Sequence, residues 1–310
     1  MGRYFAAPSK RLGRQRARRG LTLADLGISK ATQSRYYVAV RRLLPKIESM
    51  KSMEQLDESV ASWIEERFQK GEPLNNVADA LSGLQYFLPA SRRRLVHSWK
   101  LFSVWRRYEV PARAPPITAD LLISMSSYCM QEDSFEMGVL LLLGFHCMLR
   151  TGEILHLRPC DLMVSDITGL VHLRKSKSGL RHNTKESVTI ESALVRAACL
   201  ELLDRHRASQ RSHLPIWKFS GSAFRSKFRQ LCSLFHVLHL NFRPYSLRRG
   251  GATAYFMSCG LMEKTLIRGR WASSSVARIY LCDSLAQLPI LKGTKETQNL
   301  VEKYLPFLSS

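Results

Sequence analysis

The amino-acid sequence predicts a mainly α-helical protein with one small β-sheet, organised as two domains. Apolar residues recur at three- and four-residue spacing along most of the chain, which is the period of a helix packed on one side. Alternation of apolar and polar residues is confined to residues 170–174 and 187–190, which flank a turn rich in Ser, Gly and Asn. Three prolines, Pro111, Pro115 and Pro116, separate two groups of helical segments. A chain of 310 residues is long enough for two domains, each with its own core.

The chain carries a large excess of positive charge. Its 47 Lys and Arg residues against 25 Asp and Glu residues give a formal net charge of +22. Such an excess repels itself unless an anionic partner neutralises it, and nucleic acid is the partner that this balance favours. A basic solubilising surface or a membrane-surface protein is the alternative.

The seven cysteines form no Cys-x-x-Cys pair and have no nearby histidine at zinc-ligand spacing. We therefore expect small buried side chains in a reducing compartment, and no metal site. The longest apolar run, residues 137–149, is interrupted by His146 and is shorter than the about 20 residues that cross a bilayer. The N-terminus lacks the apolar segment of a signal peptide, so none is predicted.

Residues 1–28 are expected to form a basic, flexible arm. The first 20 residues contain seven Lys and Arg residues and no acidic residue, so they cannot form a core of their own. Arms of this kind bind phosphate or serve as nuclear addresses. An arbitrary basic tail, or an upstream fragment of a longer coding sequence, is the alternative.

Residues 29–108 are expected to form a small domain of four helices. The first helix begins near residue 29 and places Tyr37, Val40, Leu43 and Leu44 at core spacing. The other helices are expected over residues 56–68, 77–87 and 91–107, with Gly and Pro residues between them.

The last of these helices is basic on one side and aromatic on the other. Its aromatic residues, Trp99, Phe102 and Trp105, are expected to lie in the core rather than to stack on bases. Its basic residues are the candidates for contact with DNA phosphates, and they are Arg92, Arg93, Arg94, Lys100, Arg106 and Arg107.

Residues 109–116 are the expected linker, and residues 117–310 the second domain. The segment 132–149 is apolar almost all round and should be the buried centre of this domain. Near the C-terminus, residues 285–308 end in a short apolar stripe that has two possible docking sites, its own domain or a neighbouring protomer. The stripe consists of Leu300, Val301, Tyr304 and Leu305. Helices are expected over residues 119–130, 132–149, 194–210 and 222–240, and strands over the two alternating stretches.

The stretch from residue 245 to residue 280 combines small residues with tyrosine, arginine and tryptophan. Gly250, Gly251 and Ala252 let a backbone approach closely because they carry little or no side chain. The serines at 273–275 can cap a helix, and the apolar spacing after them predicts that Tyr280 lies on its last turn.

This stretch resembles the active-site motif of the tyrosine recombinases, the phage-integrase family. That motif reads His-x-x-Arg, then His or Trp some twenty residues on, then the nucleophilic Tyr nine residues later. Here Tyr245-Ser-Leu-Arg248 is followed by Trp271 and, nine residues later, by Tyr280. The first histidine alone is replaced.

Two further boxes of that family have counterparts, and the resemblance covers roughly residues 116–290. The family's earlier Leu-Arg-x-x-Glu-hydrophobic motif matches Arg150 and Glu153. The family also places a lysine on a β-hairpin between the two boxes. Lys177 is the first choice for this lysine and Lys175 the second.

The resemblance implies a role for each matched residue. Tyr280 would be the nucleophile that forms a 3′-phosphotyrosyl bond. Arg150 and Arg248 would stabilise the charge on the non-bridging oxygens of the transition state. Lys177 would protonate the leaving 5′ oxygen as general acid. Glu153 would orient an active-site side chain.

The remaining candidates would support the phosphate. Trp271 would contact it through its indole N–H and pack on the nucleophile. Tyr245 departs from the family's usual His, and an unperturbed tyrosine titrates near pH ~10, but its neutral hydroxyl can donate to a phosphate oxygen. Hairpin telomere resolvases, which are relatives of the family, also carry Tyr there. Arg249 and Arg158 would bind flanking phosphates or acidic side chains.

We therefore expect a site-specific DNA recombinase or integrase of a mobile element, whose core-binding and catalytic domains form a C-shaped clamp on double-stranded DNA. It should need no metal and no cofactor, and should self-associate on DNA, from dimer to tetramer, through its C-terminal helix. The alternatives are a type IB topoisomerase or telomere-resolvase-like enzyme, and a catalytically silent, domesticated DNA-binding protein. The expected compartment is the nucleus in a eukaryote and the cytoplasm in a prokaryote.

Overall fold

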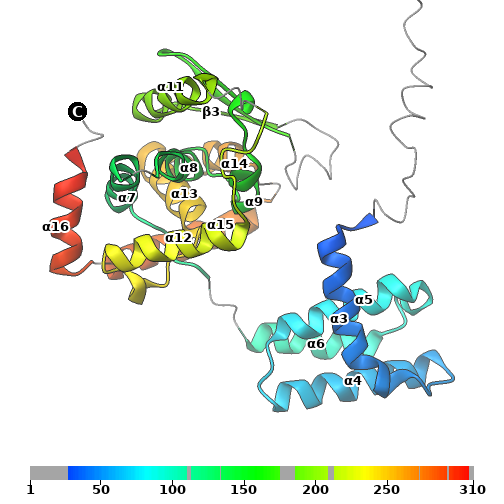
Figure 1. The fold of residues 1–310 in the computed structure, drawn as a ribbon. Coiled ribbons are helices and arrows are strands. Elements are labelled where there is room, and N and C mark those ends of the chain that lie inside the picture. The colour runs from blue at the N-terminus through cyan, green and yellow to red at the C-terminus, as the bar shows by residue number, and fades with distance from the viewer. Residues whose placement is uncertain are drawn as a thin grey trace, which may run out of the picture. The chain divides into compact units, whose positions relative to one another are not determined.

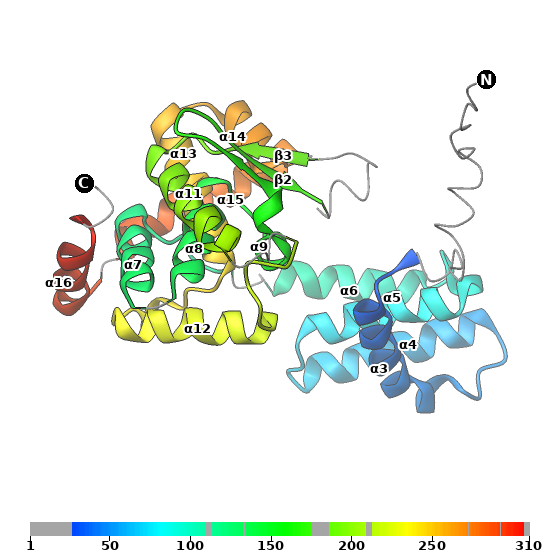
Figure 2. The same cartoon turned by 45° about the horizontal axis from the view of Figure 1, so that its top comes forward.

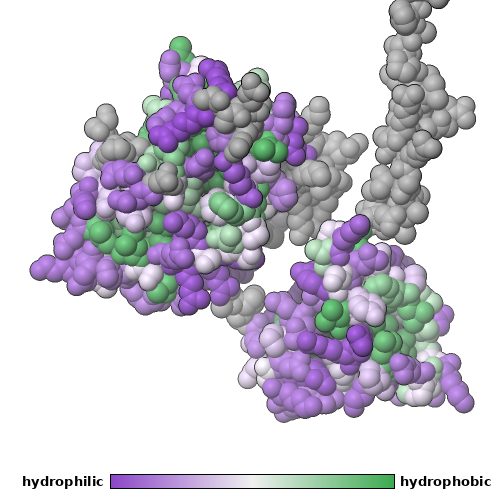
Figure 3. All heavy atoms as spheres, in the orientation of Figure 1, coloured by the Kyte–Doolittle hydropathy of each residue, from purple (hydrophilic) through white to green (hydrophobic). Residues whose placement is uncertain are grey.

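The computed structural model describes residues 27–109, 113–132, 134–174, 186–208, 213–271, 273–291 and 293–306. The chain divides into two compact units, Met1–Ala112 and Arg113–Ser310 (Figure 1). Hydrophilic side chains dominate the face of each unit drawn in Figure 3, with smaller apolar patches between them. Among the described helices, none has the length and apolar character needed to cross a membrane.

The first unit is a bundle of helices around one apolar core, drawn in blue to cyan in Figure 1. Leu43, Val60, Val77 and Leu81 are completely buried at its centre. Its helices are α3 (Lys30–Ile47), α4 (Met53–Gln69), α5 (Leu74–Phe87) and α6 (Val96–Tyr108). The fold class expected for this part of the chain is therefore confirmed.

The helix α3 buries a narrower face than its sequence predicts. Val40 and Leu43 are buried as expected, but Tyr37 is 58% exposed and Leu44 is 37% exposed. The third buried position is Ala39. Among the described elements, α3 packs mainly on α5 and α4, and the apolar spacing overestimated the face that these contacts bury.

The helix α6 begins five residues later than predicted, because Arg93 has a left-handed backbone (φ 62°) that ends any helical run through residues 91–95. The prediction that its aromatic residues lie in the core is confirmed for Phe102 and Trp105, while Trp99 is partly buried against the same core. Phe102 and Trp105 are buried, and the Trp105 ring meets the edge of Phe68 with a centroid distance of 5.1 Å. The six basic candidates, Arg92, Arg93, Arg94, Lys100, Arg106 and Arg107, are all exposed.

A buried carboxylate on α4 caps the start of α6. Asp57 accepts the backbone N–H groups of His97 at 2.8 Å and Ser98 at 2.9 Å, and the Ser98 hydroxyl at 2.6 Å. These are donors in the first turn of α6, which has no side-chain cap of its own. Burial raises the pKa of Asp57, but the hydrogen bonds from Ser98 and His97 outweigh burial and hold the pKa below its usual value.

The second unit is built around α8 (Phe135–His146), as the sequence predicts. All its residues from Met137 to Phe145 are buried, and neighbouring helices pack around it (Figures 1 and 2). The other α-helices described in this unit are α7 (Ala119–Gln131), α9 (Thr151–His156), α11 (Ala193–Ala208), α12 (Gly221–Leu234), α13 (Tyr245–Cys259), α14 (Met262–Gly269), α15 (Ser274–Gln287) and α16 (Lys295–Tyr304), of which α7, α9, α11 and α13 pack on α8.

A three-stranded antiparallel sheet lies beside these helices, in the order β1-β2-β3. The two predicted strands are β2 (Gly169–Leu173) and β3 (Glu186–Thr189), paired so that Val171 faces Val188. The strand β1 (Leu162–Val164) was not predicted, because three residues are too few to show alternation. Figure 2 shows β2 and β3 running next to α14.

Two glycines allow α13 to lie directly against neighbouring backbone. A Cβ atom at Gly251 would come within 1.9 Å of the Phe145 carbonyl oxygen of α8, and one at Gly250 within 2.1 Å of the Ile117 carbonyl oxygen. The close approach predicted for this small-residue run is therefore confirmed. It brings the first turn of α13 to the C-terminal end of α8.

The helix that carries residue 280 is longer than predicted. It runs from Ser274 to Gln287, so Tyr280 lies in its middle and not on its last turn. The helix continues because Leu281 and Ser284 are also buried. Leu281 belongs to a small cluster with Met148 and Ala252, which holds α15 against the end of α8.

The C-terminal helix α16 packs on its own unit. Tyr304 is buried and meets Tyr128 of α7 edge-on at a centroid distance of 5.4 Å. The Thr297 hydroxyl donates to the Phe235 carbonyl at 2.8 Å. The apolar stripe thus packs on its own domain in the single chain, which is one of the two docking sites expected for it, while self-association on DNA through this helix stays a prediction.

Candidate active site

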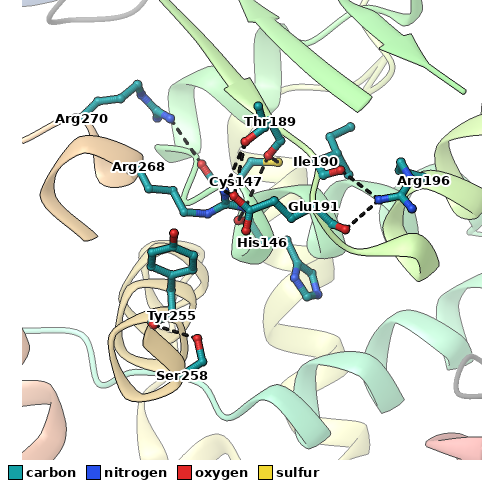
Figure 4. Close-up of polar contacts among 10 residues, drawn as sticks. All are labelled: His146, Cys147, Thr189, Ile190, Glu191, Arg196, Tyr255, Ser258, Arg268 and Arg270. Atoms are coloured by element: carbon teal, nitrogen blue, oxygen red, sulfur yellow. Dashed lines mark hydrogen bonds and ion pairs between the residues drawn. The ribbon is translucent and has the colours of Figure 1, made fainter. Parts of the chain in front are cut away.

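The C-terminal end of α8 is where the candidate residues converge. The last carbonyl groups of a helix lack intrahelical partners and carry partial negative charge. After α8 the chain turns sharply at Met148, whose backbone is left-handed (φ 47°). Arginines from later in the chain donate to the carbonyl oxygens at this end: Arg268 to His146 at 3.0 Å, Arg270 to Cys147 and Met148 at 3.3 Å each, and Arg248 to Met148 (Figure 4 shows Arg268 and Arg270).

Arg150 and Glu153 form the start of α9. The backbone N–H of Arg150 donates to Glu153 Oε2 at 2.8 Å, which caps the helix. The Arg150 guanidinium also donates to Glu153 Oε1 at 2.7 Å. The Glu153 side chain is 3% exposed and that of Arg150 is 28% exposed, so the carboxylate is buried and the guanidinium reaches the surface.

Arg248 lies on the first turn of α13 and is only 1% exposed. Besides Met148, it donates to the Gly269 carbonyl at 2.5 Å. Its guanidinium carbon lies 4.7 Å from the centroid of the Trp271 ring, a cation–π contact. Gly269 is the last residue of α14, and a Cβ atom there would lie 1.8 Å from the Trp271 ring. This position therefore requires glycine.

Arg270 joins the Arg150 and Arg248 parts of the site, and the sequence analysis did not find it. It donates to Glu153 Oε2 at 2.7 Å and shares the Met148 carbonyl with Arg248. Burial lowers the pKa of the Arg270 guanidinium, and the nearby Glu153 carboxylate opposes that shift. A charged residue between Gly269 and Trp271 was the available signal, but no sequence pattern names its partners.

Comparison with known proteins bears on this arrangement. No family model and no curated protein matches the sequence. The Tn1549 transposon integrase in complex with transposon right end DNA has a TM-score of 0.57 at 11% identity, over 95% of this chain and 98% of that one. A lambda integrase dimer bound to a COC′ core site has a TM-score of 0.56 at 16% identity, and the match covers 84% of this chain and 73% of that one. A lambda integrase tetramer bound to a Holliday junction has a TM-score of 0.55 at 14% identity, and the match covers 87% of this chain and 76% of that one.

The chain has the fold of the tyrosine recombinases. Within this recombinase fold, Tyr245 is the first residue of α13, one helical turn before Arg248, and is 42% exposed. The backbone of Tyr280 lies in α15, while its side chain lies outside the described part of the structure. Lys177 and Lys175 lie in segment 175–185, which is also outside it. Their predicted roles stay predictions.

Arg249 pairs with an acidic side chain, which is one of the two partners expected for it. Its side chain is completely buried. It donates to the Asp283 carboxylate at 2.5 Å, to the Ser284 hydroxyl at 2.7 Å and to the Ala114 carbonyl at 2.8 Å. The expected acidic partner is therefore Asp283, and Arg249 ties α13 to α15.

A small cavity adjoins the candidate site. A cavity of about 80 Å³ opens beside Glu153, between α9 and the sheet, and includes His156 and His172 in its lining. In the part of the chain that the structure describes, no three His, Cys, Asp or Glu side chains gather as metal ligands would.

Proposed function

We propose that the protein is a site-specific DNA recombinase or integrase that cleaves and rejoins DNA strands through a 3′-phosphotyrosyl intermediate. The observation that carries this proposal is the network at the end of α8. There Arg150 and Arg248 are linked through Glu153, Arg270 and the Met148 carbonyl. The helix α15, which carries residue 280, packs against Met148 through Leu281. Two guanidinium groups and a tyrosine on adjoining elements suit phosphoryl transfer.

In the proposed reaction the Tyr280 phenolic oxygen attacks the scissile phosphorus and the bond to the 5′ oxygen breaks. The bond energy is conserved in the phosphotyrosine, so the free 5′ hydroxyl can later reverse the step on the same or another strand. Arg150 and Arg248 stabilise the charge of the pentavalent transition state. Lys177 supplies the proton to the leaving oxygen, and Tyr245 donates a hydrogen bond to the phosphate.

Double-stranded DNA is the proposed substrate and partner. The solved structures with this fold include complexes with transposon end DNA, a core site and a Holliday junction. The exposed basic residues of α6 are suited to phosphate contact, and the net charge of +22 favours it. Self-association on DNA is part of the proposal, because two of those complexes are described as a dimer and a tetramer.

A nicked suicide substrate tests this function, because the short released fragment diffuses away and traps the covalent intermediate. We expect a protein–DNA band that survives denaturation, with the protein on the 3′ phosphate and a free 5′ hydroxyl on the other side. Strand-exchange products should require two sites. DNA binding with no covalent band would favour the catalytically silent protein instead. On an intact substrate, cleavage and resealing at a single site would favour the topoisomerase or resolvase alternative.

A further inference from the structure

Arg270 is held in an unusual conformation at the centre of the candidate site. Its backbone is left-handed, with φ 56°, a region that residues with side chains adopt uncommonly. Its side chain is only 8% exposed. A buried, charged residue in such a conformation indicates that the surrounding contacts hold it there, which makes its contacts the feature to explain.

Those contacts connect separate parts of the unit. The guanidinium donates to Glu153 Oε2 on α9 at 2.7 Å, and to the carbonyl groups of Cys147 and Met148 after α8 at 3.3 Å. Its Nε lies 3.4 Å from Glu186 Oε2 on β3, an ion pair whose alignment does not make a hydrogen bond. A single side chain therefore bridges α8, α9 and the first residue of β3. Trp271 follows it directly in the chain.

The Glu153 carboxylate is shared between two arginines. Its Oε1 accepts from Arg150 and its Oε2 from Arg270, and both bonds are 2.7 Å long. With the side chain 3% exposed, water cannot neutralise this carboxylate. Among the described residues, Arg150 and Arg270 are the side chains that pair with it. Loss of Arg270 would leave a buried negative charge to be balanced by Arg150.

We propose that Arg270 is a positioning residue of the strand-transfer reaction, which balances Glu153 so that Arg150 is not drawn away from the scissile phosphate. Because Arg270 also pairs with Glu186, it links the start of β3 to the Glu153 carboxylate. This inference rests on the proposed function, because it assigns Arg150 to the phosphate. Arg270 itself does not touch the reacting atoms.

Arg268 provides a matched comparison. It comes from the same end of α14 and is similarly buried, at 9% exposure. It donates to the His146 carbonyl at 3.0 Å and to Glu191 at 2.5 Å, and reaches Thr189 at 3.4 Å (Figure 4). It thus anchors the end of β3 to α8, as Arg270 anchors the beginning, but it makes no ion pair with Glu153.

The decisive experiment is a double-mutant cycle read by single-turnover cleavage of the suicide substrate at saturating DNA. Arg270→Gln should slow cleavage about a hundredfold, the scale of a misplaced catalytic group, with DNA affinity within about twofold of wild type. The double variant Arg270→Gln, Glu153→Gln should cleave at least about tenfold faster than Arg270→Gln alone, because the unbalanced charge of Glu153 is gone. Adding Glu153→Gln to Arg268→Gln should give no such recovery.

Multiplicative losses in the Glu153→Gln, Arg270→Gln pair would overturn the proposal, because they would mean that Arg270 does not act through Glu153. Arg270→Lys is the second variant should Arg270→Gln not fold. Lysine keeps the positive charge but lacks the several N–H donors of the guanidinium group. We therefore expect a smaller decrease in the cleavage rate, which Glu153→Gln should also relieve.

Hydrogen exchange of the free protein tests the linkage without any activity. Arg270→Gln should speed amide exchange both in residues 151–156 of α9 and in β3, whereas Arg268→Gln should speed it in β3 alone. Unchanged exchange in residues 151–156 of Arg270→Gln would refute the linkage. If wild type formed no covalent adduct, the proposed function would be wrong, while the exchange result would still decide whether Arg270 holds α9 and β3 together.

Discussion

Replacing Gly251 with alanine should separate α13 from α8 and displace the candidate active site. The new Cβ would lie 1.9 Å from the Phe145 carbonyl oxygen, whereas ordinary contacts begin at 3.4 Å, so the helices must move apart by about 1.5 Å. Phe145 belongs to α8 and cannot yield by a change of rotamer, because the contact is with its backbone. We expect overpacking to cost about 3 kcal/mol, which outweighs the ~1 kcal/mol that alanine gains over glycine in an unhindered helix.

Thermal unfolding and cleavage kinetics measure the two consequences. The midpoint temperature of thermal unfolding of the second unit should fall by about 5 °C or more. Because Arg248 lies one turn before Gly251 and binds the Met148 carbonyl, cleavage should slow about a hundredfold, the scale of an ångström-sized misplacement. Gly152→Ala is the control, since nothing lies within 4 Å of its Cβ position, and it should leave the transition unchanged or raise it. A Gly251→Ala protein as stable as wild type would refute the close approach of the two helices.

Other parts of the structure give independent predictions. Arg150→Ala and Arg248→Ala should each slow cleavage by about a hundredfold or more, and rates within about threefold of wild type would exclude their assigned roles. Asp57→Asn should lower the unfolding transition of the first unit by removing a charged cap, at a cost of about 2 kcal/mol. Because the folded pKa of Asp57 is depressed, this stability is present above its unfolded pKa of about 3.9 and disappears as pH falls through the folded value, so the two proteins should converge in strong acid. Deleting residues 294–308 should lower the melting temperature of the second unit, since α16 contributes to its core; an unchanged melting temperature would mean that α16 docks elsewhere in solution.

Long apolar patterns made most of the fold predictable. The run around α8 is apolar on every side and could only be a buried centre, and the alternation at β2 and β3 was confirmed in place. Errors arose where burial depends on neighbours that the pattern does not specify. Tyr37 and Leu44 have helical spacing, yet the described residues of the first unit leave them 58% and 37% exposed.

The candidate site was predictable where residues sit within short motifs, and not where pairing crosses the chain. Arg150 and Glu153 are three residues apart, so their contact follows from one helical turn. Arg249 pairs with Asp283 and Arg270 pairs with Glu153. These partners are too far apart in the sequence for any local pattern to predict the pairing. A single sequence shows that these arginines exist, but only the packing of the helices decides which side chain stays partly exposed, as that of Arg150 does, and which are buried in pairs, as those of Arg249 and Arg270 are.

The most direct test of the central claim is to compare wild type, Tyr280→Phe and Tyr245→Phe on the nicked suicide substrate. The change to phenylalanine at 280 removes the attacking oxygen and keeps the ring, so DNA affinity should match that of wild type. We expect a covalent adduct with wild type, a slower one with Tyr245→Phe, and none with Tyr280→Phe. An adduct that forms on Tyr280→Phe at the wild-type yield would show that the nucleophile is another residue.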